Sequence, residues 1–227
     1  MASSPALIAF ESREAMAARL ADLVEAALGR ALEARGAASL AVSGGASPAG
    51  LYAALSRRRL DWARVTAALV DERWVPPTSE GSNERFIRET LARHEAAAAR
   101  LVGLWSATTP AQGLRAAEAR LPKGFDVVLL GMGEDGHAAS WFPHAEGLRD
   151  ALSKEARLAV VTTGGAYRQR MTLTLGAVAS APLVILLIAG EAKRRAFEEA
   201  RRAGPVEDAP VRAILQERPD LWVAWAP

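Results

Sequence analysis

The chain has 227 residues, half of them hydrophobic, and its 28 basic and 26 acidic residues leave a formal net charge of +2. That charge is too small to indicate a nucleic-acid partner, and no uncharged stretch reaches the roughly 18 residues that a membrane span needs. The chain has no cysteine, which excludes a disulfide framework, a cysteine nucleophile and a cysteine zinc site. We therefore expect a soluble globular protein without nucleic-acid or membrane partners.

The first twenty residues, MASSPALIAFESREAMAARL, place no basic segment ahead of an apolar core of signal-peptide length. We therefore expect no export signal and a cytoplasmic location. No repeat and no long Pro/Gly/Ser linker divides the sequence, so we expect one domain over residues 1–227. A monomer is favoured.

Short apolar runs alternate with longer segments rich in alanine and charge, a pattern typical of α/β proteins. The runs predict strands at 39–44, 65–71, 125–131, 157–163, 182–190 and 221–226. The segments between them predict helices at 12–35, 48–58, 83–94, 110–120, 171–179 and 190–202. Because the strands are almost wholly apolar, we expect a three-layer α/β/α fold with a mainly parallel, Rossmann-like sheet. Ligands of such sheets lie beyond the carboxyl ends of the strands, and four loops at those ends carry unusual residues.

The first loop, SGGASP, joins a predicted strand to a predicted helix. Gly44 and Gly45 leave backbone N–H groups free to face an anion such as phosphate. Ser47 is expected to cap the helix, and Pro48 suits its first turn. The loop lacks the lysine of a P-loop and the third glycine of a dinucleotide fingerprint, so a plain strand-to-helix turn that begins at Ser43 is the alternative.

The second loop, LVDERWVPPTSEGSN, places Asp71, Glu72 and Arg73 at the end of a strand. Neighbouring acids and bases are costly to bury unless they are paired or bound to a ligand. Arg73 is a candidate for gripping a phosphate or a developing oxyanion, and Asn83 for binding a sugar hydroxyl. A structural ion pair is the alternative.

The third loop, GMGEDGHAASWFPH, follows the apolar run FDVVLL. Its glycines, among them Gly133, permit backbone turns and close approach of a ligand. Histidine is the side chain most often used as a general base, so His137 is the candidate for that role. Asp135, His137 and His144 lack the spacing of a known metal motif, so we expect no metal site.

The fourth loop region comprises TGGAYRQRMTLTL and LLIAGEAKRRAF, which place Arg168, Arg170 and Lys193 after two further strands. Lys193 falls at the start of a predicted helix, where the helix dipole disfavours a cation unless an anion lies nearby. It is therefore a candidate phosphate ligand. The alternative is an ordinary surface lysine.

Taken in order, the segments SGGASP, DERWVPPTSEGSN, GMGEDGHAASWFP, RMTLTL and AGEAK span nearly the whole chain. Together they resemble the glucosamine-6-phosphate isomerase/6-phosphogluconolactonase family. The resemblance implies the fold shared by glucosamine-6-phosphate deaminases and ribose-5-phosphate isomerases, and an enzyme that acts on a phosphosugar without a cofactor.

Two features favour the lactonase branch of this family over the deaminase branch. Deaminases carry a glutamate five residues after the histidine, where this chain has Phe142, and their second loop tends to read DEY where this one reads DER. Ser47 and Trp141 replace the threonine and leucine that are usual in the family, and neither change removes a required chemical group.

The lactonase resemblance implies hydrolysis of a 6-phosphosugar lactone, whose phosphate would be held by the loop from Ser43 to Ser47, Arg170 and Lys193. His137 would activate water, and Asp135 would help to set the orientation or the charge of His137. Arg73 or backbone N–H groups of the glycine loop would stabilise the oxyanion. The remaining substrate-binding candidates are Gly44, Gly45, Asp71, Asn83 and Gly133.

Two other functions stay open from the sequence. One is an amino-sugar phosphate deaminase or isomerase, which Phe142 disfavours. The other is a non-catalytic sugar-phosphate sensor, for which the presence of His137 is unnecessary because binding alone would need only the phosphate loops. A sensor of the transcriptional kind also needs a DNA-binding module, and we expect no room for one before the first predicted strand at residue 39.

Overall fold

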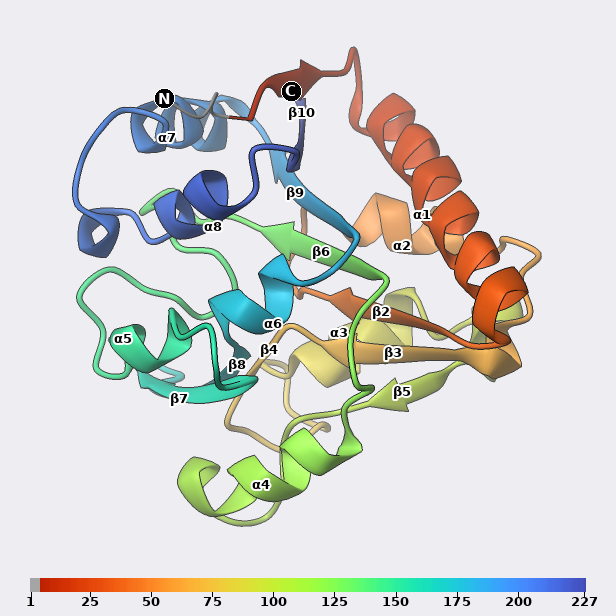
Figure 1. Cartoon of the computed structure of the whole chain (residues 1–227), viewed down its shortest axis with the longest axis horizontal. Helices are drawn as coiled ribbons and strands as arrows, with labels where there is room; N and C mark the ends of the chain where they lie inside the picture. Colours follow the sequence, from red (N-terminus) through yellow and green to blue (C-terminus); the bar gives the residue numbers. More distant parts are fainter. Residues whose placement is uncertain (1–4) are drawn as a thin grey trace.

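The computed structural model describes residues 5–227 (Figure 1). Residues 1–4, which begin the segment expected to lack an export signal, lie outside the described part. Within it, seven strands form one sheet in which every neighbouring pair is parallel. Their order is β1 (Leu7–Ala9), β10 (Trp222–Ala226), β9 (Leu183–Ala189), β6 (Val127–Gly131), β2 (Ala38–Val42), β3 (Val65–Leu69) and β5 (Arg100–Val102).

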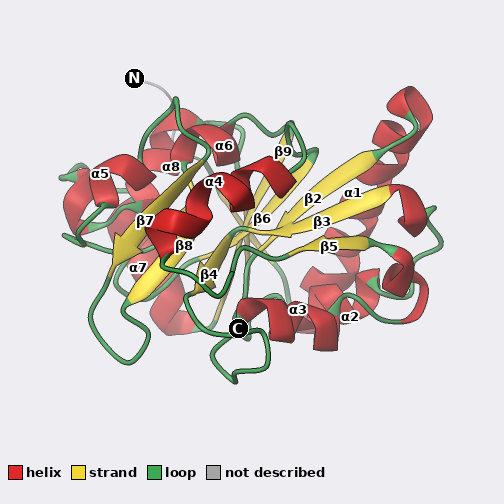
Figure 2. Cartoon of the chain, turned by 90° about the horizontal axis from the view of Figure 1, so that it is seen from below, coloured by secondary structure: helices red, strands yellow, loops and turns green. Residues whose placement is uncertain are grey.

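Helices cover both faces of this sheet, as Figure 2 shows for α2 and α3 on one side and α4 and α6 on the other. The helices are α1 (Arg13–Arg35), α2 (Ala49–Leu55), α3 (Asn83–Thr90), α4 (Pro110–Arg120), α5 (Leu148–Ala151), α6 (Leu175–Ala179), α7 (Glu191–Ala200) and α8 (Val211–Glu217). Short 3₁₀ turns occur at Trp62–Arg64, His94–Ala98 and Val206–Asp208. The predicted three-layer α/β architecture is confirmed.

The longest helix, α1, has clear end signals in the sequence. The Ser12 side chain accepts a hydrogen bond from the backbone N–H of Ala15, and Gly36 ends the helix in the left-handed conformation at φ 71°. These are the residues that favour the two ends of a helix. Leu20, Val24 and Leu28 share one face of α1 and are completely buried, so the helix is held mainly by packing against the sheet.

The strand order determines where a ligand can bind. From β2 the chain continues to β3 and β5 on one side, whereas β6 lies on the other side of β2 and is followed by β9 and β10. In parallel sheets, the crevice at such a reversal, beyond the carboxyl ends of the strands, is the usual ligand site. The loops after β9, β6, β2 and β3 are therefore neighbours at this edge.

A second sheet of three strands differs from the prediction. It has the order β4 (Asp71–Arg73), β8 (Gln169–Leu173) and β7 (Leu158–Thr162), and both pairings are antiparallel. The strand predicted at 157–163 is therefore correct in place but wrong in its sheet. The helix predicted at 171–179 is wrong over its first part, because residues 169–173 form β8 and only 175–179 are helical.

The error over 171–179 has a physical reason. The segment MTLTL supports a strand once β4, about one hundred residues earlier, lies beside it, and no local pattern announces that pairing. The sequence patterns also did not predict four short elements: β1, β5, α5 and α8. Within residues 5–227, no helix combines the length and the hydropathy that would be needed to cross a bilayer.

Candidate active site

A pocket opens at the carboxyl ends of the central strands and gathers residues from all four loop regions. Every residue predicted for the site lines it except Asp135, which lies behind His137. The lining set comprises Ser43, Gly44, Gly45, Ser47, Asp71, Arg73, Asn83, Gly133, His137, Arg170 and Lys193, joined by Ala46, Pro48, Gly131, Met132 and Ala139.

The glycine loop after β2 is shaped by close contacts. The Ser43 hydroxyl donates to the carbonyl of Leu129 in β6 at 2.8 Å, and the Ser43 carbonyl accepts from the Tyr52 hydroxyl at 2.7 Å. A Cβ on Gly44 would lie 2.0 Å from Oδ1 of Asn83, and Gly45 has a φ of 98°. Both positions therefore require glycine, one for space and the other for its backbone conformation.

Ser47 does not cap α2, contrary to the prediction. The N-cap residue is Pro48, and no side chain accepts a hydrogen bond from the first turn. Instead the Ser47 hydroxyl accepts from Nζ of Lys193 at 3.3 Å. This contact brings the start of α7 to the glycine loop, so that a serine and an ammonium group face the same end of the pocket.

Asp71 is buried and anchors a polar cluster at the floor of the pocket. Its carboxylate accepts from the Ser140 hydroxyl at 2.5 Å and from Nδ2 of Asn83 at 3.3 Å, and its carbonyl accepts from the same amide at 2.8 Å. Sequence reasoning missed Ser140, although its place three residues after His137 was a signal. The Ser140 backbone N–H also donates to the hydroxyl of Thr172 in β8, which ties the histidine loop to the small sheet.

Arg73 reaches the pocket from β4 with much of its donor capacity unused. Its Nη1 donates to the carbonyl of Gly81 at 2.9 Å, and its buried Nε has no hydrogen-bond partner among the described residues. Its Cζ lies 5.9 Å from the centre of the Tyr167 ring. Because a buried unsatisfied N–H carries a free-energy cost, the guanidinium is suited to donate a hydrogen bond to a ligand oxygen.

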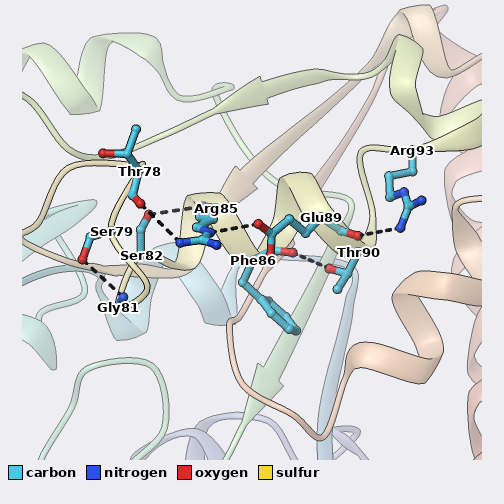
Figure 3. A network of polar contacts seen from close by, with 9 residues as sticks. All are labelled: Thr78, Ser79, Gly81, Ser82, Arg85, Phe86, Glu89, Thr90 and Arg93. Carbon is cyan, nitrogen blue, oxygen red and sulfur yellow. Dashed lines mark hydrogen bonds and ion pairs between the residues drawn. The ribbon is translucent and has the colours of Figure 1, made fainter.

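The loop that holds Arg73 is itself fixed to α3, as Figure 3 shows. The Ser82 side chain caps the helix by accepting from the backbone of Arg85. The Arg85 side chain reaches back to the carbonyl of Thr78 and forward to the carboxylate of Glu89. These contacts connect the proline-containing loop after β4 to the helix that begins at Asn83.

Glu72, for which the sequence suggested no role, is completely buried beside the same helix. Its carboxylate accepts from the backbone N–H groups of Arg73, Asn83 and Glu84 and from the Ser82 hydroxyl, at 2.7–3.0 Å. Burial raises the pKa of Glu72 to about 7, against these hydrogen bonds, which lower it. The side chain thus occupies the amino end of α3, where an acidic group is favoured.

The histidine loop after β6 closes on itself around His137. The carbonyl of His137 accepts from the backbone of Gly133, and its ring Nδ1 lies 2.5 Å from Oδ1 of Asp135. A Cβ on Gly133 would lie 2.2 Å from this Nδ1, so only glycine leaves room for the imidazole.

Asp135 determines which nitrogen of His137 is basic. Partial burial opposes ionisation of Asp135, but the hydrogen bond and charge of His137 outweigh it and hold the pKa of Asp135 below its ordinary value. An ionised carboxylate can only accept a hydrogen bond, so the hydrogen lies on Nδ1 and Nε2 is the free base. Since Asp135 does not line the pocket, Nε2 is the ring nitrogen left for a ligand.

Arg170, in β8, and Lys193, in α7, supply further positive charge to the pocket. Arg170 stands opposite Arg73 in the β4–β8 pairing. Burial and the charge of Arg73 keep the pKa of Arg170 below its ordinary value, although the charge of Asp71 acts in the other direction. Burial likewise lowers the pKa of Lys193, with Glu134 opposing. Arg168, the other arginine considered for phosphate, lines a different cavity.

Three cationic side chains, a glycine loop and an imidazole with one nitrogen free thus share one pocket. Fold and pocket together define an α/β protein with a site suited to a phosphorylated small molecule. Residues 11–224 match the family model described as glucosamine-6-phosphate isomerases/6-phosphogluconolactonase. The chain belongs to this family.

Individual relatives agree with this assignment. A 6-phosphogluconolactonase of Rhizobium meliloti is 42% identical over 225 residues, which cover 96% of this chain and 97% of that protein. The crystal structure of a 6-phosphogluconolactonase from Shewanella baltica matches with a TM-score of 0.95 and 36% identity over the whole of both chains. A monomeric glucosamine-6-phosphate deaminase, 19% identical, matches with a TM-score of 0.80 and covers 97% of this chain and 96% of that one, which shows a shared fold.

Proposed function

We propose that this chain hydrolyses 6-phospho-D-glucono-1,5-lactone to 6-phospho-D-gluconate, the lactone step of the oxidative pentose phosphate pathway. The observation that carries the proposal is the contact between Nδ1 of His137 and Asp135. It leaves Nε2 as a base in a pocket with three cations. Relatives that are 36–42% identical over nearly the whole chain and bear the name 6-phosphogluconolactonase support it.

The substrate lies with its phosphate at the glycine loop, Lys193 and Arg170. An anion there removes the cost of holding Lys193 half-buried beside the start of α7. Charge-assisted hydrogen bonds from the guanidinium and the ammonium group fix the phosphate. Asp71 and Asn83, at the floor of the pocket, then face the sugar hydroxyls.

His137 accepts a proton from water at Nε2 as the water oxygen attacks the lactone carbonyl carbon. The C=O electrons move onto oxygen, and Arg73 or backbone N–H groups of the glycine loop stabilise the resulting oxyanion. Collapse of this intermediate breaks the bond from the carbonyl carbon to the ring oxygen. The imidazolium returns its proton to that oxygen, and the new carboxylic acid ionises to give the open product.

Asp135 supports this cycle without contacting the substrate. Its carboxylate keeps the hydrogen on Nδ1 and stabilises the imidazolium that forms during attack. The alternative function, deamination of an amino-sugar phosphate, lacks a carboxylate at the position of Phe142, where the structure places an apolar ring against His137.

The deciding experiment is an assay of purified protein on freshly prepared 6-phosphogluconolactone, with the spontaneous hydrolysis rate subtracted. We expect rapid enzyme-dependent acid release, and no measurable ammonia from glucosamine 6-phosphate. Ammonia release at a rate rivalling lactone hydrolysis would show that the deaminase function is the correct one. Binding of the phosphosugar without turnover of either compound would favour the sensor.

We also propose that the protein is a single-domain monomer in the cytoplasm. The two parts of this proposal are tested separately. Gel filtration with light scattering measures the mass of the particle, and fractionation of cells that express the protein shows where it is located.

A further inference from the structure

The ring of Phe142 contacts two residues of the pocket. It stacks on the imidazole of His137, with ring centroids 4.0 Å apart and planes 26° from parallel. The guanidinium carbon of Arg170 lies 4.8 Å from the centre of the same ring. One side chain thus supports both the base and a cation of the proposed site.

Among the described residues, Phe142 does not belong to the lining of the pocket, in contrast to His137 and Arg170. The residue is half-buried. It lines a separate cavity, which includes His144 and Arg168. Any influence on a bound substrate must therefore pass through His137 or Arg170.

We propose that Phe142 is a positioning residue, which sets the plane of the His137 imidazole and the direction of the Arg170 guanidinium together. The inference rests on the proposed lactone hydrolysis for its kinetic part. Its structural part, the restraint of the His137 ring, is independent of that function.

The imidazole needs a contact on its face in addition to the one at its edge. Asp135 restrains His137 at Nδ1, but the side chain remains 28% exposed, and a single hydrogen bond leaves room for the ring plane to tilt. A general base must hold its lone pair in line with the proton it removes. The flat ring of Phe142 restricts this tilt.

The guanidinium benefits for a different reason. Among the described residues, only the Tyr167 carbonyl accepts a hydrogen bond from the Arg170 side chain, through Nε at 3.3 Å. A ring face attracts a cation without occupying any N–H group, whereas a carboxylate partner would occupy two. Phe142 therefore holds Arg170 and leaves both Nη groups free for phosphate oxygens.

Phe142→Leu and Phe142→Tyr separate positioning from simple packing. Leucine keeps an apolar side chain but has no flat face, and tyrosine keeps the face, with its hydroxyl directed to the neighbouring cavity. We expect Phe142→Leu to lower kcat about tenfold on 6-phosphogluconolactone and on the lactone without phosphate. On the phosphorylated lactone alone it should also raise KM about threefold to tenfold. Phe142→Tyr should keep both kcat and KM within about twofold of the wild-type values.

The Arg170 part has its own test in a double substitution. In an Arg170→Ala background, Phe142→Leu should no longer raise KM, while its effect on kcat persists. An unchanged KM effect in that background would overturn the coupling to Arg170. Phe125→Leu, which removes a buried ring at the opposite end of β6 from the histidine loop, is the packing control and should leave both constants within about twofold of wild type.

The His137 part is tested without activity, by the proton NMR signals of the three histidines. A ring stacked on Phe142 experiences its ring current, so the His137 signals should be displaced from those of His94 and His144. The displacement should disappear in Phe142→Leu and persist in Phe142→Tyr. If the His137 signals do not move in Phe142→Leu, or if tyrosine is as impaired as leucine, Phe142 does not position the base.

Failure of the proposed function has a different signature. A wild-type protein that does not hydrolyse the lactone, yet shows a displaced His137 signal that depends on an aromatic residue at 142, would refute lactone hydrolysis. The restraint of His137 would stand.

Discussion

His137 is the residue on which the proposed chemistry depends most directly. We expect His137→Ala to fold normally and to lose about 100-fold to 10,000-fold in kcat, because a positioned general base contributes that much. The measurement is initial-rate kinetics with spontaneous hydrolysis subtracted. His144→Asn is the matched control, since His144 is exposed, pairs with Asp208 and lies outside the pocket; asparagine also tolerates its positive φ. If His137→Ala kept more than about half the corrected kcat, the assignment of the base would be wrong.

Arg170 and Lys193 are expected to act on binding rather than on the chemical step. Arg170→Ala and Lys193→Ala should each raise KM for the phosphorylated lactone about tenfold or more, because a charge-assisted hydrogen bond contributes about 1.5–3 kcal/mol. The kinetic constants for the lactone without phosphate should change far less. The measurement is kcat/KM of each variant on both substrates. Arg168→Ala, two residues away and facing another cavity, is the control. Equal losses on both substrates would mean that the two cations support the fold instead.

At the scale of elements, the amino end of α3 links stability to pH through Glu72. The unfolded carboxyl has its ordinary pKa of 4.5, and burial raises the folded value to about 7. Between these values the folded chain holds a proton that the unfolded chain releases. The contribution of Glu72 to stability is therefore full below pH 4.5 and is lost as the pH rises through about 7.

Glu72→Gln provides the comparison, because it cannot titrate. We expect the variant to be less stable than wild type, since its amide NH₂ faces backbone donors. The difference in the free energy of unfolding should shrink by about 1.4 kcal/mol per pH unit across that window. Urea unfolding at several pH values measures this. A difference that stays constant between pH 4.5 and about 7 would show that Glu72 is ionised in the folded chain as well, and that its hydrogen bonds outweigh burial.

The pairing of β4 with β8 is the element-level feature that local patterns did not announce. It places Arg73 opposite Arg170 and Asp71 opposite Thr172. The two arginines therefore reach the pocket from adjacent strands, whereas the sequence suggested that Arg170 came from a loop ahead of a helix. Two cations side by side repel each other. The carboxylate of Asp71 opposes this repulsion at Arg170, and a phosphorylated ligand would add further negative charge.

For the molecule as a whole, we predict lactone hydrolysis without added metal and at an unchanged rate in the presence of a chelator. The reaction requires one base, one activated water and a polarised carbonyl, and His137, Asp135 and Arg73 supply these roles as proposed. The experiment compares initial rates before and after dialysis against EDTA. Loss of hydrolysis on chelation, with recovery on adding a divalent metal, would contradict this mechanism.

The sequence by itself was sufficient for the α/β class, for the strands of the central sheet other than its two edge strands β1 and β5, and for the loops that form the pocket. Apolar runs, glycine pairs and capping residues are local signals, and parallel strands bring their carboxyl ends to one edge by geometry alone. Only the tertiary structure decided which partners the side chains take. Ser47 contacts Lys193 instead of capping α2, Ser140 binds Asp71, and β8 pairs with β4. Each contact joins segments tens of residues or more apart, where packing of the whole chain outweighs local preference.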